Sequence, residues 1–449
     1  MFPAINAIAD ALGPWVDPIA LPALRHLYFP LSRLWAAASV RPISDPRFQA
    51  ETGISIGHPV MRGLATGLAA QVAQRYEAMR QANRSWEEHF FGPDAARLGR
   101  HAEIEAERRA AAGRWMVGRM ILAPLRLAAD VPPVRWQIPS PSDVDTAYAR
   151  FLDRPAEAFM PALPWPEIAV SHPIESGDTR SYWVRFPAPH PRLADMTSVK
   201  IVEPLATPVR ATVIAGNGVC IEPELYPSRV LEIAGSLVGR GLRVIEMTSP
   251  WHGRRTTPGW YGGERFFAGV PLSTLDLFIG QSWELAVLID WCRRAFSGPV
   301  GVVGVSMSAL VTQLALSHAT SWPASAQPDA AFLMLHSSAI DEIAFTGELV
   351  DALGILHELE KAGWWRAALL RWSPLLTPAD RICIAPQRLV SLLARDDRVM
   401  PVAGGIAQLD RWRVPAANRF VWPHSHMSVP AMLRLDDSPI RRFVEILTS

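Results

Sequence analysis

The chain has 449 residues, of which 49% are hydrophobic and 19% are charged. This composition is typical of a globular protein with a sizeable core, and the length predicts more than one domain. Lys and Arg number 44 against 43 Asp and Glu, so the chain has no overall charge that would attract nucleic acid.

The cysteines and the N-terminus indicate where the protein works. Cys220, Cys292 and Cys383 are too far apart to suggest a disulfide framework or a metal site, which indicates a reducing, cytoplasmic location. Residues 1–6 lack the features of a signal peptide. No apolar run approaches the roughly 20 residues that span a bilayer. We therefore expect a soluble protein without a transmembrane segment, whose only membrane contact would be peripheral.

Residues 1–130 form a predicted helical N-terminal region. Apolar positions recur at helical spacing from Leu64 to Asn83, and a second segment runs from Asp94 to Leu127. Its polar middle carries the attractive i,i+4 pair Glu105/Arg109. We expect these helices to pack on the rest of the chain or on a second copy in a homo-oligomer. A membrane-surface role is the alternative. Four tryptophans are candidate anchors for them: Trp15, Trp35, Trp86 and Trp115.

Residues 131–180 are rich in proline and form a predicted linker that wraps the next domain. One short helix is expected in this linker, after the capping pattern Ser142-x-x-Asp145.

The pattern changes over residues 181–449, where short apolar runs alternate with helical segments. Such alternation predicts a mostly parallel sheet covered by helices on both faces, an α/β fold. The predicted strands are Tyr182–Phe186, Val199–Val202, Thr212–Ala215, Leu242–Met247, Pro299–Val303, Ala330–Leu335, Arg388–Ala394 and Arg419–Trp422. The predicted helices include Ser228–Val238, Thr274–Arg294 and Pro439–Leu447. A helical insertion over about 341–386 is expected to lie over the carboxyl ends of the strands as a lid.

One serine stands at a sharp turn between a strand and a helix. Gly304-Val305-Ser306-Met307-Ser308 follows the apolar run 299–303 and precedes the helix-like stretch 309–316. Small residues two positions on either side of Ser306 are what a nucleophile elbow requires, because strand and helix nearly touch there. The second of these small residues is Ser308, where glycine is more common. The sequence predicts Ser306 as a nucleophile.

A serine nucleophile needs a base to accept its proton and an acid to orient that base. On this type of sheet the chain order is serine, acid, histidine. We favour Asp397 over its neighbour Asp396 because it lies further into the loop after a strand; Asp341 is the alternative acid. The histidine follows the last strand, and we favour His426 over His424, since only one of them reaches both partners.

The developing oxyanion needs backbone donors. The amide of Met307 is one candidate, and the amide of Gly218 or Val219 is the other, with Asn217 holding that loop. His252 and His336 are candidate pocket residues. Neither a dinucleotide fingerprint nor a phosphate loop or metal cluster occurs in the sequence, so the predicted chemistry needs no cofactor.

The segment from about 210 to 320 resembles the α/β-hydrolase superfamily, and residues 180–449 resemble its alpha/beta hydrolase domain-containing protein 18 family. The resemblance rests on seven stretches: Ala215–Gly218, Pro250–Arg254, Gly304–Ser308, Phe345–Leu349, Glu358–Lys361, Asp397–Pro401 and His426–Ser428. The chain departs from the family pattern at Ser308 and at His424-Ser425, where glycines are expected. The resemblance implies an α/β-hydrolase fold, a Ser306–Asp397–His426 triad and hydrolysis of an ester of a lipid-like kind.

Together these observations predict a serine hydrolase of the carboxylesterase type that forms an acyl-enzyme at Ser306. Trp364, Trp365 and Trp372 in the insertion favour a hydrophobic or acyl-chain ester as the small-molecule substrate. Two alternatives stay open. The same triad could transfer the acyl group to an acceptor other than water, or the fold could serve as a non-catalytic scaffold whose N-terminal helices mediate assembly.

Overall fold

The computed structural model describes residues 13–95, 99–221 and 233–449. Three of the sequence predictions therefore fall partly or wholly outside the described residues. They are the N-terminal hexapeptide 1–6, residues 96–98 of the predicted segment 94–127, and residues 228–232 of the predicted helix 228–238.

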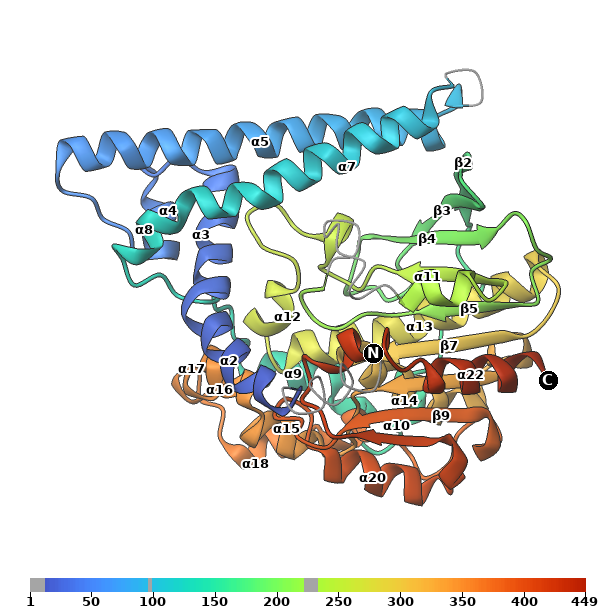
Figure 1. Ribbon diagram of the computed structural model, residues 1–449. Coiled ribbons are helices and arrows are strands. Elements are labelled where there is room, and N and C mark those ends of the chain that lie inside the picture. The colour runs from blue at the N-terminus through green and yellow to red at the C-terminus, as the bar shows by residue number, and fades with distance from the viewer. Residues whose placement is uncertain (1–12, 96–98, 222–232) are drawn as a thin grey trace.

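A ten-stranded sheet organises the chain, in the order β1-β3-β4-β6-β5-β7-β8-β9-β10 with β2 beside β3 (Figure 1). The pairs from β1 to β4, and β4 with β6, are antiparallel, whereas all pairs from β6 to β10 are parallel. The strands are β1 Ala169–Val170, β2 Ile174–Ser176, β3 Thr179–Pro187, β4 Met196–Pro204, β5 Ala211–Ala215, β6 Leu242–Met247, β7 Val300–Val305, β8 Ala330–Met334, β9 Leu389–Ala394 and β10 Arg419–Trp422. All predicted strands are present, and the central ones are apolar throughout because helices cover both of their faces.

Two groups of helices cover the sheet. Apolar side chains of α13 and α14 and the end of α20 share a core with one face, and those of α11, α21 and α22 share a core with the other. These helices are α11 Ile233–Val238, α13 Leu272–Ala295, α14 Met307–His318, α20 Val402–Arg411, α21 Val429–Met432 and α22 Ser438–Thr448. Among the described helices, α13 is long and apolar enough to cross a membrane, but 83% of its most apolar window is buried inside the protein, as in a core helix.

The N-terminal helices lie against one side of this body (Figure 1). They are α2 Val16–Ala23, η2 Leu24–Tyr28, α3 Phe29–Val40, α4 Pro46–Thr52, α5 Pro59–Phe91, α7 His101–Val117, η3 Gly118–Leu122 and α8 Ala123–Leu127. The helix predicted over 64–83 is longer in the structure, where α5 runs from Pro59 to Phe91. The predicted segment 94–127 is divided into α7, η3 and α8. The helices α2 and α3 were not predicted. Every residue from Phe29 to Ser39 is buried, so this stretch has no polar face and no amphipathic period.

Buried contacts fix these helices to the body. Arg33 of α3 donates to both carboxylate oxygens of Glu264 in α12 (Glu264–Ala268), at 2.7 and 2.8 Å, and both side chains are fully buried. Trp35 packs on Trp115 within the helical region, with ring centroids 4.1 Å apart. Trp86 of α5 meets Trp183 of β3 edge to face at 5.1 Å. Trp15, by contrast, is 64% exposed.

The proline-rich stretch carries α9 (Pro141–Tyr148), η4 (Ala149–Phe151) and α10 (Pro155–Ala158). The predicted cap of its helix is wrong by two residues: Ser140 is the N-cap and shares a capping box with Asp143, rather than Ser142 with Asp145. Both pairs fit the sequence pattern. Pro141 decides between them, because proline is favoured at the first helical position.

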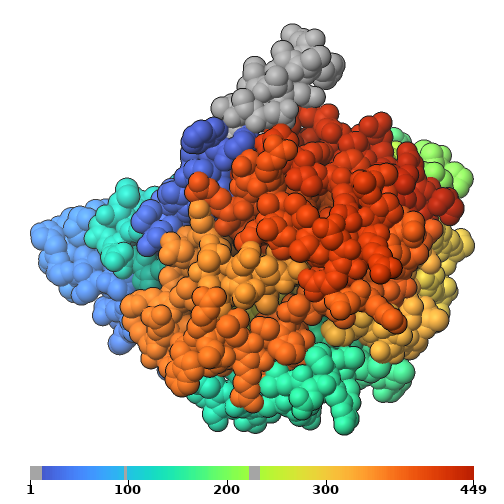
Figure 2. Space-filling view, turned by 90° about the horizontal axis from the view of Figure 1, so that it is seen from below, coloured from blue at the N-terminus to red at the C-terminus, as the bar shows by residue number. Residues whose placement is uncertain are grey.

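Five helices lie between β8 and β9: α15 Ile340–Thr346, α16 Glu348–Leu353, α17 Ile355–Lys361, α18 Arg366–Leu370 and α19 Ser373–Leu376. In the space-filling view, this orange insertion lies directly beside the blue N-terminal helices (Figure 2). The guanidinium of Arg25 is 3.7 Å from the carboxylate of Asp351 across this contact. The insertion and the N-terminal helices thus meet at the same end of the body.

The order of strands, the antiparallel start followed by parallel strands, and the helices on both faces make this an α/β-hydrolase fold with helical extensions. The predicted fold class is confirmed. The sheet is mixed and mostly parallel, as predicted, and its antiparallel pairs involve the first strands of the sheet.

Candidate active site

Ser306 lies at the sharp turn between β7 and α14. Its backbone has φ 54° and ψ −117°, in the positive-φ region that L-residues rarely adopt. The amide of Ser306 donates to the carbonyl of Met334 on the neighbouring strand at 2.9 Å. Strained backbone of this kind is typical of functional turns. The geometry is that of the elbow predicted from the sequence.

Close packing explains which residues flank this turn. A Cβ on Gly304 would lie 2.6 Å from the Thr312 hydroxyl and 2.7 Å from the Ala309 Cα, so no larger residue fits there. The Ser308 hydroxyl accepts from the amide of Val305 at 2.8 Å and donates to its carbonyl at 3.0 Å. Serine at this position therefore satisfies two backbone groups of the turn.

The space for Ser308 comes from the strand β5 side. A Cβ on Gly216 would lie only 2.6 Å from the Ser308 Cβ. A serine can replace the more common glycine at position 308 because residue 216, which it contacts, is a glycine.

Three of the predicted side chains form a continuous line of hydrogen bonds. His426 Nε2 is 3.0 Å from Ser306 Oγ, and His426 Nδ1 is 2.8 Å from Asp397 Oδ2. The second oxygen of Asp397 accepts from the amides of Val399 at 2.8 Å and Met400 at 2.6 Å. With Nδ1–H donated to Asp397, the neutral imidazole presents its Nε2 lone pair to the Ser306 hydroxyl.

Electrostatics favour a basic His426. Burial disfavours the charged imidazolium, but the carboxylate of Asp397, its hydrogen bond to the ring and the charge of Asp17 outweigh burial. The pKa of His426 is therefore raised above its ordinary value. A higher pKa makes the ring a stronger acceptor for the serine proton.

The alternative residues lie elsewhere. Asp341 is on α15 and lines a cavity of the insertion, whereas Asp397 is the carboxylate bonded to His426. The amide of Asp396 donates to the carbonyl of His424 at 3.0 Å, which joins the loops after β9 and β10. His424 is buried, and its ring is packed so closely on Gly13 that a Cβ there would lie 1.8 Å from Nδ1.

The predicted oxyanion loop lies beside Ser306. A Cβ on Gly218 would lie 3.4 Å from the Ser306 Cβ, and Asn217, Gly218 and Val219 line the same cavity as Ser306. Met307 begins α14 directly after the serine. The first backbone amides of a helix have no acceptor within the helix, and this holds for the amide of Met307.

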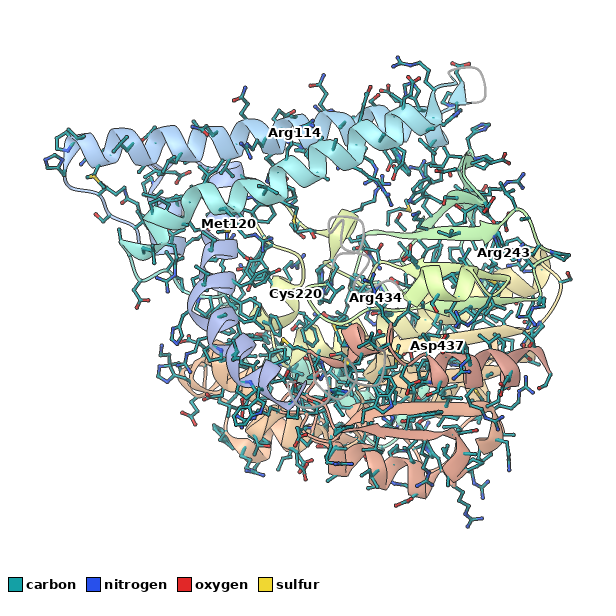
Figure 3. The ribbon with its side chains drawn as sticks, in the orientation of Figure 1. Arg114, Met120, Cys220, Arg243, Arg434 and Asp437 are labelled. Atoms are coloured by element: carbon teal, nitrogen blue, oxygen red, sulfur yellow. The ribbon has the colours of Figure 1, made fainter. Side chains whose placement is uncertain are left out.

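The two histidines predicted to line the pocket are absent from the lining of the cavities beside Ser306. His252 Nε2 accepts from the Cys220 amide at 3.0 Å and its Nδ1 lies 2.8 Å from the Pro250 carbonyl, so the ring joins the chain at Cys220 to the segment after β6. Cys220 lies between α3 and the sheet in the view of Figure 3. His336 is fully buried, with Nε2 2.8 Å from the Ser391 hydroxyl. Burial lowers the pKa of each histidine to about 4, which keeps both neutral.

Two apolar cavities meet at Ser306. The first, about 350 Å³, lies toward the N-terminal helices and is lined by Leu24, Tyr28 and Phe29. The second, about 180 Å³, lies under the insertion, and among its described lining residues Asp341 is the one charged side chain. The insertion tryptophans do not line it: Trp364 and Trp372 are buried in the core, and Trp365 is 65% exposed. Within the described residues, no group of three or more His, Cys, Asp or Glu side chains could hold a metal ion.

The chain was compared with known proteins. No protein-family model matches the sequence, and no curated protein matches it. Among solved structures, it is similar to an acetyl xylan esterase from Paenibacillus sp. R4, with a TM-score of 0.47 and 14% identity, covering 67% of this chain and 95% of that one. It is also similar to acetyl xylan esterase 1 from Thermoanaerobacterium sp. JW/SL YS485, with a TM-score of 0.44 and 13% identity over 64% and 93% of the two chains. A cold-adapted esterase from an Arctic intertidal metagenomic library gives a TM-score of 0.40 and 16% identity over 64% and 100%.

Sequence reasoning assigned no site residue to the N-terminal region. In the structure, Leu24, Tyr28 and Phe29 line the first cavity, and Asp17 contacts the histidine loop. No local pattern marks these residues, because their partners lie hundreds of positions away. A single aspartate within the otherwise apolar stretch 15–24 is the one sequence signal that could have drawn attention to Asp17.

Proposed function

We propose that this protein is a serine hydrolase that cleaves a carboxylic ester through an acyl-enzyme at Ser306. The observation that carries the proposal is the unbroken line of hydrogen bonds from Ser306 through His426 to Asp397, at the strained turn after β7. This combination is what nucleophilic catalysis by serine requires.

In the proposed reaction, His426 Nε2 takes the proton of the Ser306 hydroxyl as Oγ bonds to the carbonyl carbon of the ester. The negative charge that develops on the carbonyl oxygen faces the amide of Met307 and the amide of Gly218 or Val219. The imidazolium then gives its proton to the departing alcohol as the C–O bond breaks. Water attacks the acyl-enzyme by the same route, which releases the acid and restores Ser306.

The lining of the two cavities supports a hydrophobic ester as substrate. Each cavity begins at Ser306 and is enclosed by mostly apolar side chains, so a chain bound there exchanges water for hydrocarbon. We propose that the insertion acts as a lid and that the acyl chain lies in the second cavity, between α15–α19 and Phe266, Phe278 and Leu310.

We also propose that the chain belongs to the alpha/beta hydrolase domain-containing protein 18 family. Several of the stretches that resemble this family contact one another around Ser306. The Glu348 amide donates to the Arg398 carbonyl at 2.9 Å, and their side chains pair at 2.7 Å, which joins the insertion to the Asp397 loop. His252, in another of these stretches, accepts a hydrogen bond from the amide of Cys220, next to the proposed oxyanion loop.

A fluorophosphonate probe tests the proposed chemistry directly. The wild type is expected to be labelled at one serine, and Ser306→Ala is expected to abolish both labelling and hydrolysis of a chromogenic ester. Ser308→Ala, which keeps Ser306, is the matched control and should still be labelled. A wild type that resists the probe would favour the scaffold alternative, and labelling without hydrolysis would favour acyl transfer.

Filling the second cavity tests the substrate class. Ala344 lines this cavity, and Ala344→Trp should lower kcat/KM for long-chain esters about 10-fold or more while leaving acetate esters unchanged, since each buried methylene contributes about 0.8 kcal/mol. Ala367→Trp places the same side chain on the exposed face of the insertion and serves as the control. An equal loss for short and long esters would contradict the acyl-chain assignment.

A further inference from the structure

The loop that carries His426 is held by α2, the first α-helix of the described chain. The Asp17 carboxylate of α2 accepts from two consecutive amides, that of His426 at 2.9 Å and that of Met427 at 2.9 Å, one with each oxygen. The amide of Asp17 donates to the Ser425 hydroxyl at 3.3 Å, and that hydroxyl donates to the Gly13 carbonyl at 2.7 Å. The two segments are therefore joined in both directions.

This junction is closed to solvent. Asp17 and Ser425 are both fully buried, and Gly13 is pressed against the His424 ring. A buried carboxylate is costly unless hydrogen bonds satisfy it, and here both of its oxygens accept from backbone amides. Such a charge-assisted pair of bonds fixes the direction of the peptide plane that precedes the His426 side chain.

We propose that Asp17 is a positioning residue for catalysis: from the N-terminal extension, it fixes the backbone of His426 so that the ring reaches Ser306 and Asp397 together. This inference rests on the proposed function, because it concerns the base of the same reaction. It assigns the N-terminal region a part in the active site itself, beyond the packing, oligomer or membrane roles expected from the sequence.

The charge of Asp17 gives this role a measurable signature. The titratable groups near the His426 ring are Asp397 on the loop after β9, Asp17 on α2, and Tyr28 and Cys220, which line the cavity that His426 also lines. Asp17 is one of the groups that raise the pKa of His426. The base works in its neutral form, so the rate falls as the pH drops through this pKa. Removal of the Asp17 charge should lower the pKa and move the acid limb of the rate profile to lower pH.

The test uses the full-length protein with Asp17→Asn and Asp17→Ala. Asparagine keeps one acceptor oxygen but turns an N–H toward the second amide, and alanine removes both acceptors. We expect kcat to fall about 10- to 100-fold, as small misplacements of catalytic groups do, with KM nearly unchanged and the acid limb at lower pH. Asp45→Asn is the control. Asp45 also accepts a hydrogen bond from a backbone amide, that of Arg47 at the start of α4, but this bond does not involve the His426 loop.

Two measurements keep the inference separate from the proposed function. Titration of the His426 ring by NMR needs no turnover, and an unchanged pKa in both Asp17 variants would overturn the inference even if the wild type proved inactive. If the wild type reacts with the fluorophosphonate probe and the folded Asp17 variants react at the same rate and with the same pH profile, the positioning role is wrong while the hydrolase stands. Circular dichroism establishes that each variant is folded.

Discussion

The turn at Ser306 and the loop at His426 present two partners of one site, but they are held in different ways. The Ser306 turn is fixed within its own strand–helix unit by the Ser308 hydroxyl on Val305, and it has one further bond, from the Ser306 amide to the Met334 carbonyl of the adjacent strand β8. The His426 loop is fixed by Asp17, at a sequence separation of 409 residues. The turn of the proposed nucleophile is thus built mainly by local sequence, whereas the loop of the proposed base depends on the docking of a distant segment.

The largest effect on activity should come from Asp397, the carboxylate that contacts His426 and through it Ser306. Asp397→Asn is expected to lower kcat about 10⁴-fold, because an amide in place of the carboxylate stabilises the wrong tautomer of the base. Asp341→Asn is the matched variant, on the insertion, and should keep most of the activity towards acetate esters. Steady-state kinetics on both variants measure this difference. A larger loss in Asp341→Asn would mean that the histidine changes partner during the reaction.

The second-largest effect should come from weakening the attachment of the N-terminal helices to the body. Arg33→Met leaves Glu264 buried without its cation, which is expected to lower the free energy of unfolding by about 3–5 kcal/mol. Urea unfolding measures the loss. Arg154→Met removes an exposed pair with Glu157 and should cost about 0.5 kcal/mol or less. Equal stability of the two variants would show that α3 is not fixed through this buried pair.

The smallest effect probes the local construction of the Ser306 turn. Gly216→Ala places a methyl group 2.6 Å from the Ser308 Cβ and should destabilise the fold by about 1–3 kcal/mol. In a Ser308→Gly background the same change should cost less, because the clashing atoms are gone. Thermal unfolding of the four proteins in this double-mutant cycle gives the coupling. Additive losses would contradict a direct contact between the two positions.

The contrast between the two elements also explains what the sequence could predict. The strand–turn–helix at Ser306 and the order of Asp397 and His426 are local signals, and in the structure the His426 ring lies within hydrogen-bonding distance of the other two side chains. The cap at Ser140 was misplaced by two residues because two serines fit one short pattern. The helix at 29–40 was missed because burial on all sides removes the amphipathic period.

Other features depend on tertiary contacts and leave no local trace. His252 is a candidate pocket residue by sequence, yet its ring accepts a hydrogen bond from the Cys220 amide. The cavity residues Leu24 and Tyr28 come from a segment with no site motif. The match between Ser308 and Gly216 joins two separate strand ends and follows only from packing.

The bond between Asp17 and His426 has a consequence for the order in which the protein is made. At a synthesis rate of about 5–20 residues per second, residue 426 emerges roughly 20–80 s after residue 17. During that interval α2 has no histidine loop to hold. The contact of Asp17 with this loop, and with it the proposed triad, can therefore form only after both the turn at Ser306 and residue 426 have been made.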